Sequence, residues 1–331
     1  MRAIIYRNYG PPEILKICDV EMPVPLDNEL LVRVRATTVT SADSRARSLK
    51  MPAGFGFLGR LLYGVTRPRQ AILGTELSGD VVGVGKAVTN FKVGDQVFAF
   101  AGASMGCYVE YKCLVADGPV AKKPPNLSYE QAAALSFGGV TMLDFYRKGA
   151  LVSGERVLVN GASGSVGIAA VQLAKHFGAH VTSVCSSGNL EMMRSIGADH
   201  VIDYTEHDFT QSGMTYDVIV DTVGTAPFSR CRHVLSPGGC LLMVRSGVAD
   251  LFKVPWFNLT SGERIVAGSA VKRSEYVHHL GELAASGKIV PVIDRSYSFD
   301  EIADAHRYVD QGHKRGSVVI SLEVSGNNTW L

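Results

Sequence analysis

The sequence predicts an α/β protein in which a doubly wound parallel sheet is combined with a second, β-rich unit. Three observations lead to this fold class. The first ~120 residues read as short strands separated by glycines, whereas from Arg156 onward strands alternate with helices. A glycine-rich turn joins the first strand of this second half to its first helix. A chain of 331 residues is also long enough for two domains of about 150 residues each.

The composition limits which binding partners and which cellular location we expect for this chain. Hydrophobic residues make up 46% of the chain and charged residues 19%, which is typical of a folded globular protein. A formal net charge of +2 gives no strong basic field, so we expect no nucleic-acid partner. No run of about 18 apolar residues is present, so we expect no membrane span. The short apolar run at the N-terminus is unlike a signal peptide, and we expect a cytoplasmic protein.

The N-terminal part predicts a barrel or sandwich of short strands. Candidate strands, which alternate or run apolar between glycines, lie at 30–36, 79–85, 93–99 and 107–113. The stretch 47–73 departs from this pattern, because it is apolar, rich in glycine and poorly periodic. Two interpretations of it stay open: a mobile lid or short helix beside a site, and a loop packed on the core.

The second half predicts a parallel sheet. Ser128 and Gln131 form a capping-box pattern that predicts the start of an alanine-rich helix. Strands follow at 156–160, 180–185, 200–203, 216–222 and 239–244, with helices at 165–177, 189–196 and 226–234. After ~270 we expect a helix at 274–286, a strand at 289–290, a helix at 300–311 and a strand at 317–322. Strands that alternate with helices predict right-handed crossovers between parallel strands.

The glycine turn predicts a dinucleotide site. An apolar strand ends at Asn160, continues into Gly161-Ala-Ser-Gly-Ser-Val-Gly167, and is followed by a helix that Gly178 terminates. A helix N-terminus exposes free N–H groups and a partial positive charge, so a pyrophosphate can dock there. The turn would bind it through Gly161, Ser163, Gly164, Ser165, Val166 and Gly167. A structural turn without a ligand is the alternative.

The tip of the next strand bears on the choice of cofactor. NAD-binding proteins usually place an acidic residue there to hold the ribose 2′-hydroxyl. This chain has Cys185-Ser186-Ser187, so no carboxylate would repel a 2′-phosphate, and the two serines can donate hydrogen bonds to it. The sequence therefore favours NADPH over NADH. Gly188 and Asn189, which follow, offer no positive charge to the 2′-phosphate.

Several further segments are specific enough to indicate a family. They are 9–15 (Tyr-Gly-Pro-Pro-Glu-Ile-Leu), 72–79 (Ile-Leu-Gly-Thr-Glu-Leu-Ser-Gly), 91–97 (Phe-Lys-Val-Gly-Asp-Gln-Val), 123–128, 159–167, 197–204 and 316–320. Together they cover nearly the whole chain, which resembles the medium-chain dehydrogenase/reductase superfamily and its zinc-independent quinone oxidoreductase branch. The resemblance implies a GroES-like catalytic domain at 1–123 and 270–331, interrupted by a Rossmann domain at 124–269. It also implies an active site between the two domains and a homodimer formed through the Rossmann sheets.

The resemblance also bears on metal chemistry. Zinc-dependent relatives hold the metal with cysteine and histidine, but this chain has Thr40 at the first ligand position and Gly74-Thr75-Glu76 where a Gly-His-Glu is usual. Only Cys107 and Cys113 fall near the structural zinc lobe of those relatives. The resemblance therefore implies no zinc. It implies hydride transfer from NADPH to a small hydrophobic quinone or α,β-unsaturated carbonyl instead.

The resemblance assigns roles to single residues. Thr141 would contact the nicotinamide end, with a purely structural place in a helix as its alternative. Tyr204 would contact the adenosine phosphate side, Val223-Gly224 the adenine side and Ser246-Gly247 the nicotinamide ribose. Asn189 stands where relatives often carry a basic ligand of the 2′-phosphate. From the residues themselves, Lys314 with Arg315 either approaches the cofactor or is a solvated basic pair, which is the usual state of such pairs near a C-terminus. Thr40 would orient the substrate oxygen. Tyr63 is either a proton donor or ring-stacking wall, or packs within the 47–73 stretch, and Asp43 is expected to be structural.

Two other functions stay open. One is a 2-enoyl thioester reductase, in which Arg60, Arg67 and Arg69 would hold the phosphates of coenzyme A or of a carrier. The other is a non-catalytic NADP-binding protein with a structural or regulatory role, because a protein can keep its fold after it has lost its catalytic activity. The pair Trp256-Phe257 would suit a hydrophobic acceptor or the core.

Overall fold

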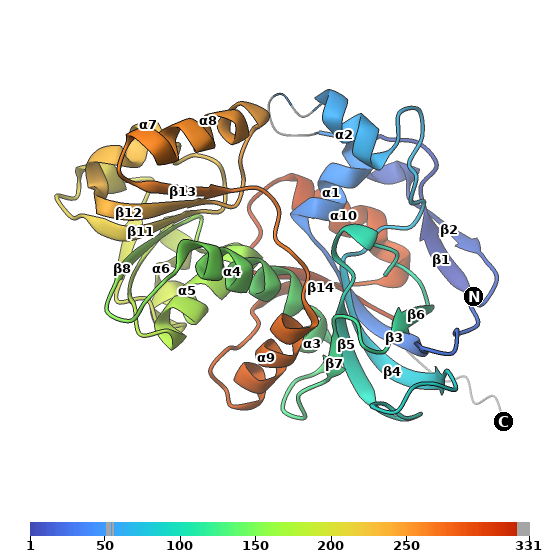
Figure 1. Cartoon of the computed structure of the whole chain (residues 1–331). Coiled ribbons are helices and arrows are strands. Elements are labelled where there is room, and N and C mark those ends of the chain that lie inside the picture. The colour runs from blue at the N-terminus through green and yellow to red at the C-terminus, as the bar shows by residue number, and fades with distance from the viewer. Residues whose placement is uncertain (51–53, 55, 323–331) are drawn as a thin grey trace.

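The computed structural model describes residues 1–50, 54 and 56–322, which form two lobes that each contain a sheet (Figure 1). The strands are β1 (Arg2–Ile5), β2 (Lys16–Asp19), β3 (Glu29–Val39), β4 (Glu76–Val84), β5 (Gln96–Phe100), β6 (Tyr111–Val115), β7 (Val120–Lys122), β8 (Arg156–Asn160), β9 (His180–Cys185), β10 (His200–Asp203), β11 (Tyr216–Asp221), β12 (Leu235–Met243), β13 (Arg264–Ala267), β14 (Ile293–Ser298) and β15 (Ser317–Ser321). The helices are α1 (Ser41–Ser48), α2 (Gly56–Tyr63), α3 (Tyr129–Ala133), α4 (Ser136–Gly149), α5 (Ser165–His176), α6 (Leu190–Ser195), α7 (Phe228–Cys231), α8 (Val248–Thr260), α9 (Ser274–Ala285) and α10 (Ile302–Asp310). No helix in this part of the chain is long and apolar enough to cross a lipid bilayer.

The β-rich lobe joins strands from distant parts of the sequence. Its main sheet has the order β14-β15-β3-β4-β5-β7, and β6 also pairs with β3. β15 lies antiparallel to β3, with Val318 opposite Val39, so a late segment of the chain completes a sheet that an early segment begins (Figure 1). Val32, Leu77 and Val97 lie in the apolar core of this lobe.

The second lobe contains the predicted parallel sheet. Its order is β10-β9-β8-β11-β12-β13, and every neighbouring pair is parallel. Counted from β8 along the chain, this is the 3-2-1-4-5-6 order of a Rossmann fold, which confirms the predicted fold class. The order reverses between β8 and β11, and ligands of such sheets bind at that reversal, outside the carboxyl ends of the strands.

Both faces of the parallel sheet are covered by helices, as Figure 1 shows. Val157 and Val159 of β8 belong to the core that includes α4 and α5. Leu158, between them, belongs to the core on the other face, with residues of α7. Successive side chains of a strand point to opposite faces, so a strand buried on both faces reads as a continuous apolar run. This explains why the sequence around β8 shows no alternation.

Most of the predicted elements are confirmed. Ser128 caps α3 as expected, because its Oγ accepts a hydrogen bond from the backbone N of Gln131 at 3.2 Å. The strand expected at 289–290 is wrong, since β14 begins at Ile293. Within 47–73 the structure has the helix α2, which confirms a short helix there, while residues 51–53 and 55 lie outside the described residues.

Candidate functional site

A cavity of about 710 Å³, here called the cleft, opens at the carboxyl ends of the parallel strands. Its wall contains the glycine turn after β8, the ends of β9 and β11, part of α1 and the segment after α10. Both lobes therefore contribute to it. The predicted cofactor-binding residues that line the cleft are Gly161, Ser163, Gly164, Ser165, Val166, Gly167, Ser186, Asn189, Tyr204, Val223 and Lys314.

The glycines of the turn serve different purposes. Gly161 has φ +77°, and a Cβ there would lie 2.5 Å from Cγ1 of Val223. A Cβ on Gly167 would lie 2.3 Å from the carbonyl oxygen of Gly161, so only glycine allows α5 to pack this closely. A Cβ on Gly164 would meet only the Gly161 oxygen, at 3.9 Å. Gly164 therefore leaves open space where a ligand can approach the backbone.

The N-terminus of α5 is suited to an anion. Gly164 is its N-cap and has no side chain to satisfy the free N–H groups of the first turn. The ammonium group of Lys314 donates hydrogen bonds to Oγ of Ser165 at 3.1 Å and to the carbonyl oxygen of Gly316 at 2.5 Å. Burial lowers the pKa of Lys314 to about 8, so this group is mostly charged at neutral pH. A helix terminus and an ammonium group thus lie together at the glycine turn.

The segment that carries Lys314 also ties the two lobes together. The backbone N of Gly316 donates to the carbonyl oxygen of Ser163 at 2.8 Å, and Gly316 forms a parallel β-bridge with Gly164. Gly316 has φ +86°, and a Cβ there would lie 2.2 Å from the carbonyl oxygen of Val292. The glycine turn is therefore held in place from the β-rich lobe.

At one end of the cleft, Asn189 lies behind the tip of β9. Its Nδ2 donates to Oγ of Ser186 at 2.9 Å, while its buried Oδ1 has no hydrogen-bond partner among the described residues. Tyr204 is 57% exposed and lines the same end. The guanidinium of Arg315 crosses from the β-rich lobe and donates to the carbonyl oxygen of Gly188 at 2.8 Å. The positive charge of Arg315 thus reaches the tip of β9, although the residues next to that tip in the sequence carry no positive charge.

Seven predicted residues do not line the cleft: Thr40, Tyr63, Thr141, Ser187, Gly224, Ser246 and Gly247. Some of them have a structural partner instead. The hydroxyl of Thr141 donates to the carbonyl oxygen of Phe137 within α4 at 2.6 Å. The backbone N of Gly224 donates to Oδ1 of Asp221 at 2.9 Å, and that of Gly247 to Oδ2 of Asp250 at 2.8 Å.

Thr40 and Asp43 form the start of α1. The hydroxyl of Thr40 donates to Oδ2 of Asp43 at 2.6 Å, and the backbone N of Thr40 donates to the same oxygen at 2.9 Å. The other carboxylate oxygen accepts from the backbone N of Gly74 at 2.9 Å. Burial raises the pKa of Asp43 to about 6 despite these hydrogen bonds. Asp43 therefore holds α1 against the 74–76 segment, in line with its expected structural role.

Glu76 is a second buried carboxyl group near the junction of the lobes. Its side chain accepts a hydrogen bond from the hydroxyl of Thr38 and another from the backbone N of Phe137, each at 2.5 Å. Burial raises the pKa of Glu76 to about 8 and that of the Cys107 thiol to about 12. Within residues 1–50, 54 and 56–322, no three His, Cys, Asp or Glu side chains are arranged so that they could hold a metal ion.

The opposite end of the cleft contains residues that sequence reasoning missed. Ser41 and Arg45 of α1 and Arg245, which follows β12, line it. Burial and the charge of Arg245 both lower the pKa of Arg45. Tyr63 interacts electrostatically with Arg45, and burial raises its own pKa. No motif marks these residues, because the folded chain brings α1 and the end of β12 together from different lobes.

Comparison with known proteins shows which family has this arrangement. Residues 26–125 match the model described as alcohol dehydrogenase GroES-like domain, and residues 196–320 match zinc-binding dehydrogenase. The chain is 33% identical to 2-methylene-furan-3-one reductase of Solanum lycopersicum, covering 97% of this chain and 79% of the relative. It is 32% identical to the quinone-oxidoreductase homolog, chloroplastic, of Spinacia oleracea, covering 97% and 98%. The chain belongs to the quinone oxidoreductase branch of the medium-chain dehydrogenase/reductase superfamily.

Solved structures of this superfamily agree with that assignment. The quinone oxidoreductase from Coxiella burnetii superimposes with a TM-score of 0.85 at 28% identity, covering 98% of this chain and 99% of that one. The Escherichia coli quinone oxidoreductase complexed with NADPH gives a TM-score of 0.80 at 25% identity, covering 97% and 100%. As a member of this branch, the chain is an oxidoreductase.

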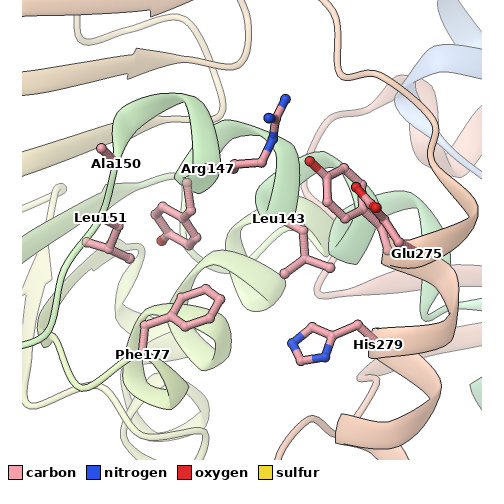
Figure 2. Close-up of a pocket in the computed structure, with 9 residues that line it drawn as sticks. Leu143, Arg147, Ala150, Leu151, Phe177, Glu275 and His279 are labelled. Carbon is pink, nitrogen blue, oxygen red and sulfur yellow. The ribbon is translucent and has the colours of Figure 1, made fainter.

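This quinone oxidoreductase fold has a second cavity of about 520 Å³, beside α4 and α9 (Figure 2). Leu143, Phe177 and His279 point toward its centre, while Arg147 points away from them. The cavity shares no lining residue with the cleft and contains no glycine turn or strand end. Its features do not match those of a nucleotide site.

Proposed function

We propose that this chain is an NADPH-dependent reductase that transfers a hydride to a quinone or an α,β-unsaturated carbonyl, without a catalytic zinc. The observation that carries the proposal is the cleft, where a glycine turn and Lys314 provide an anion site at the N-terminus of α5. The cleft extends from there to an end lined by both lobes. Relatives named as quinone and NADPH-dependent alkenal/one oxidoreductases support the same chemistry.

The described residues fit the pyrophosphate and adenosine parts of NADPH. The pyrophosphate would lie over Gly164, on the N–H groups of α5 and beside Lys314. The adenosine would lie against Tyr204, with the unpaired Oδ1 of Asn189 available to a ribose hydroxyl. Arg315 would supply the positive charge that a 2′-phosphate needs.

One carboxylate lies near the adenosine end, where NADH-specific sites use an acidic residue to hold the ribose 2′-hydroxyl. Asp203 ends β10, and its register partner is Cys185 at the end of β9. Its Oδ1 accepts hydrogen bonds from the backbone N and the hydroxyl of Thr205, at 2.9 and 2.7 Å. Hydrogen bonding from the side chain of Ser187, and then from Thr205, lowers the pKa of Asp203. The tip of β9 itself carries serines, which supports NADPH.

The residues of the chain would position the reactants and exclude water. Bound NADPH supplies a hydride at its nicotinamide ring. Hydride addition would leave negative charge on the acceptor oxygen, which hydrogen-bond donors that line the cleft would stabilise. The hydroxyl of Thr40 already donates to Asp43, and Thr75 replaces an imidazole, so the donor set at these positions does not suit Zn²⁺. The proposal therefore contains no Lewis-acid step.

An acceptor panel tests this function. Loss of NADPH absorbance is followed with 9,10-phenanthrenequinone, with 3-penten-2-one and with crotonyl-CoA, in the presence and absence of EDTA. We expect turnover of the quinone or the enone that EDTA leaves unchanged. Turnover of crotonyl-CoA alone would favour a thioester reductase. Binding of NADPH without oxidation by any acceptor would favour a non-catalytic role.

The structure gives the thioester alternative no additional support. Arg60, Arg67 and Arg69 are exposed and do not line the cleft. Arg60 lines a separate surface hollow together with Tyr9 and donates a hydrogen bond to the carbonyl oxygen of Val65 at 2.9 Å. The neighbouring enoyl reductase structure, CurK, is only 21% identical and shows the fold alone.

A homodimer is the second part of the proposal. Phe252, Trp256 and Leu259 are 81%, 68% and 82% exposed and form one apolar stripe along α8. That helix packs beside β13, the edge strand of the parallel sheet, so a second copy can cover both. Light scattering tests this: we expect the wild type to be a dimer and Trp256→Glu to be a monomer.

A cytoplasmic location stays a prediction of the sequence.

A further inference from the structure

Two arginines line the end of the cleft opposite Asn189, here called the acceptor end, and neither forms an ion pair with a described residue. Arg45 comes from α1 in one lobe, and Arg245 follows β12 in the other. Neither side chain makes a hydrogen bond or ion pair with any residue that the structure describes, whereas Arg230, farther along the same cleft, pairs with Asp208 at 3.0 Å. The two unpaired guanidiniums therefore differ from a cleft arginine whose charge is already matched.

The electrostatics favour an anion between these side chains. The charge of Arg245 lowers the pKa of Arg45, which means that the two positive groups are close enough to repel each other. Asp43 also acts on Arg45, but both of its oxygens accept hydrogen bonds from Thr40 and Gly74. Arg45 is half-buried and Arg245 is exposed. Two like charges held close together repel each other, and a negative group bound between them would relieve that repulsion.

The position of Arg45 and Arg245 relative to the proposed cofactor site indicates which ligand they would bind. Cγ and Cδ of Arg245 lie 3.5 Å from where a Cβ of Gly224 would be, so the side chain covers the loop after β11. The pyrophosphate site is at the turn after β8, and the adenosine end lies beyond β9. The nicotinamide of a dinucleotide bound across the reversal point would therefore lie on the β11–β12 side. Arg45 and Arg245 then flank the hydride acceptor, away from the 2′-phosphate.

We infer that the preferred acceptor is an α,β-unsaturated carbonyl compound that carries a carboxylate, bound between Arg45 and Arg245. This inference rests on the proposed function and specifies its substrate class. Each guanidinium has a fork of N–H donors that matches the two oxygens of a carboxylate. In the reaction, hydride from NADPH forms a C–H bond at the β-carbon. The C=C π pair moves toward the carbonyl, and a solvent proton adds at the α-carbon, which yields the saturated keto acid and NADP⁺.

A matched pair of acceptors tests the inference. We compare kcat/KM for (E)-4-oxo-2-pentenoate and for its methyl ester, which differ in the negative charge. We expect the wild type to prefer the carboxylate by at least about 10-fold, the size of a charge-assisted hydrogen bond. In Arg45→Met and Arg245→Met this preference should fall to about 1, with the ester changed by less than about 3-fold. Arg307→Met removes an exposed positive charge that pairs with Glu13 and serves as the control.

Three outcomes would overturn the inference. The wild type could use the ester as well as the carboxylate, which would leave the proposed reductase function intact. Arg45→Met and Arg245→Met could lower kcat/KM by the same factor for the carboxylate and for the ester. The variants could raise the Kd of NADPH by about 10-fold or more, which would assign the arginines to the cofactor.

A binding measurement keeps the test independent of turnover. Calorimetry of 4-oxopentanoate, the saturated product, is performed on the protein saturated with NADP⁺. We expect binding to the wild type and to Arg307→Met, and at least about 10-fold weaker binding to the Arg45→Met/Arg245→Met double variant. If no acceptor is reduced, the proposed function fails while this measurement still decides whether the anion site exists. Equal binding to the wild type and the double variant would refute the site.

Discussion

The two ends of the cleft are built in different ways. The pyrophosphate end is local, since Gly161, Gly164 and Gly167 lie within one turn and the helix that follows it. The acceptor end is assembled from two lobes, with Arg45 on α1 and Arg245 after β12. Backbone N–H groups bind the phosphates that all nicotinamide dinucleotides share, whereas side chains from distant segments select the acceptor. A family can therefore keep the first end unchanged while its substrates vary.

The largest expected effect concerns the scaffold of the acceptor end. Asp43→Ala leaves the backbone N of Thr40, the hydroxyl of Thr40 and the backbone N of Gly74 without their acceptor. We expect a loss of about 3 kcal/mol in the free energy of unfolding, measured with urea. Asp304→Ala, which removes an exposed partner of Arg307, should change it by less than about 1 kcal/mol. Equal losses in both variants would contradict the role of Asp43.

The same group gives a pH dependence with a defined sign. The pKa of Asp43 is raised from 3.8 to about 6 in the folded state, so the folded protein binds this proton more tightly than the unfolded chain does. The corresponding stability is present below pH ~4 and is lost as the pH rises to about 6. Comparing wild type and Asp43→Ala across this range should show a difference that shrinks with rising pH, and a constant difference would refute the assignment.

The next effect belongs to the pyrophosphate end. In Gly167→Ala the new Cβ would lie 2.3 Å from the Gly161 carbonyl oxygen and 2.6 Å from Cα of Ala162, both backbone atoms that cannot move freely. We expect the Kd of NADPH, followed by fluorescence, to rise by about 30-fold or more, which corresponds to about 2 kcal/mol of strain. Gly83→Ala, whose Cβ would make only ordinary contact with Leu31, should bind normally.

Lys314, also at the pyrophosphate end, gives a smaller effect. Its pKa is lowered to about 8, so its charge, and with it the attraction for a pyrophosphate, is lost as the pH rises through 8. We expect the Kd of NADPH to increase above pH 8 in the wild type. In Lys314→Met it should be about 10-fold higher at pH 7 and should no longer change near pH 8. A wild-type increase that persists in Lys314→Met would assign the pH dependence to another group.

The smallest effect tests cofactor choice. Arg315 is exposed, so solvent screens its charge. Arg315→Ala should lower the preference for NADPH over NADH by about 3- to 5-fold, measured as the ratio of the two kcat/KM values. The Kd of NADH should stay unchanged, because NADH has no 2′-phosphate. A loss that affects both cofactors equally would indicate that Arg315 acts only by holding Gly188.

The sequence by itself determined the features that depend on neighbouring residues. The strand, glycine turn and helix at 156–176 were predicted from the sequence and are confirmed. The phosphate site proposed there follows from the same local pattern, because it needs only a helix N-terminus and glycines at fixed spacing. The cap at Ser128 was predicted for the same reason. The strand at 289–290 was wrong, because β14 begins four residues after the expected start, at Ile293, and element boundaries depend on packing.

Only the tertiary structure decided which distant side chains share the cleft. Arg315 reaches Gly188 from the other lobe, although the residues next to Gly188 in the sequence carry no positive charge. Arg45 and Arg245 meet for the same reason, and Thr40, expected at the substrate, is instead held by Asp43 at the start of α1. Local patterns encode backbone geometry over a few residues, whereas charge pairing across a cleft depends on how two lobes pack. The sequence therefore determined the turn at which we propose that the dinucleotide binds, and the packing of the lobes decided which side chains lie opposite it.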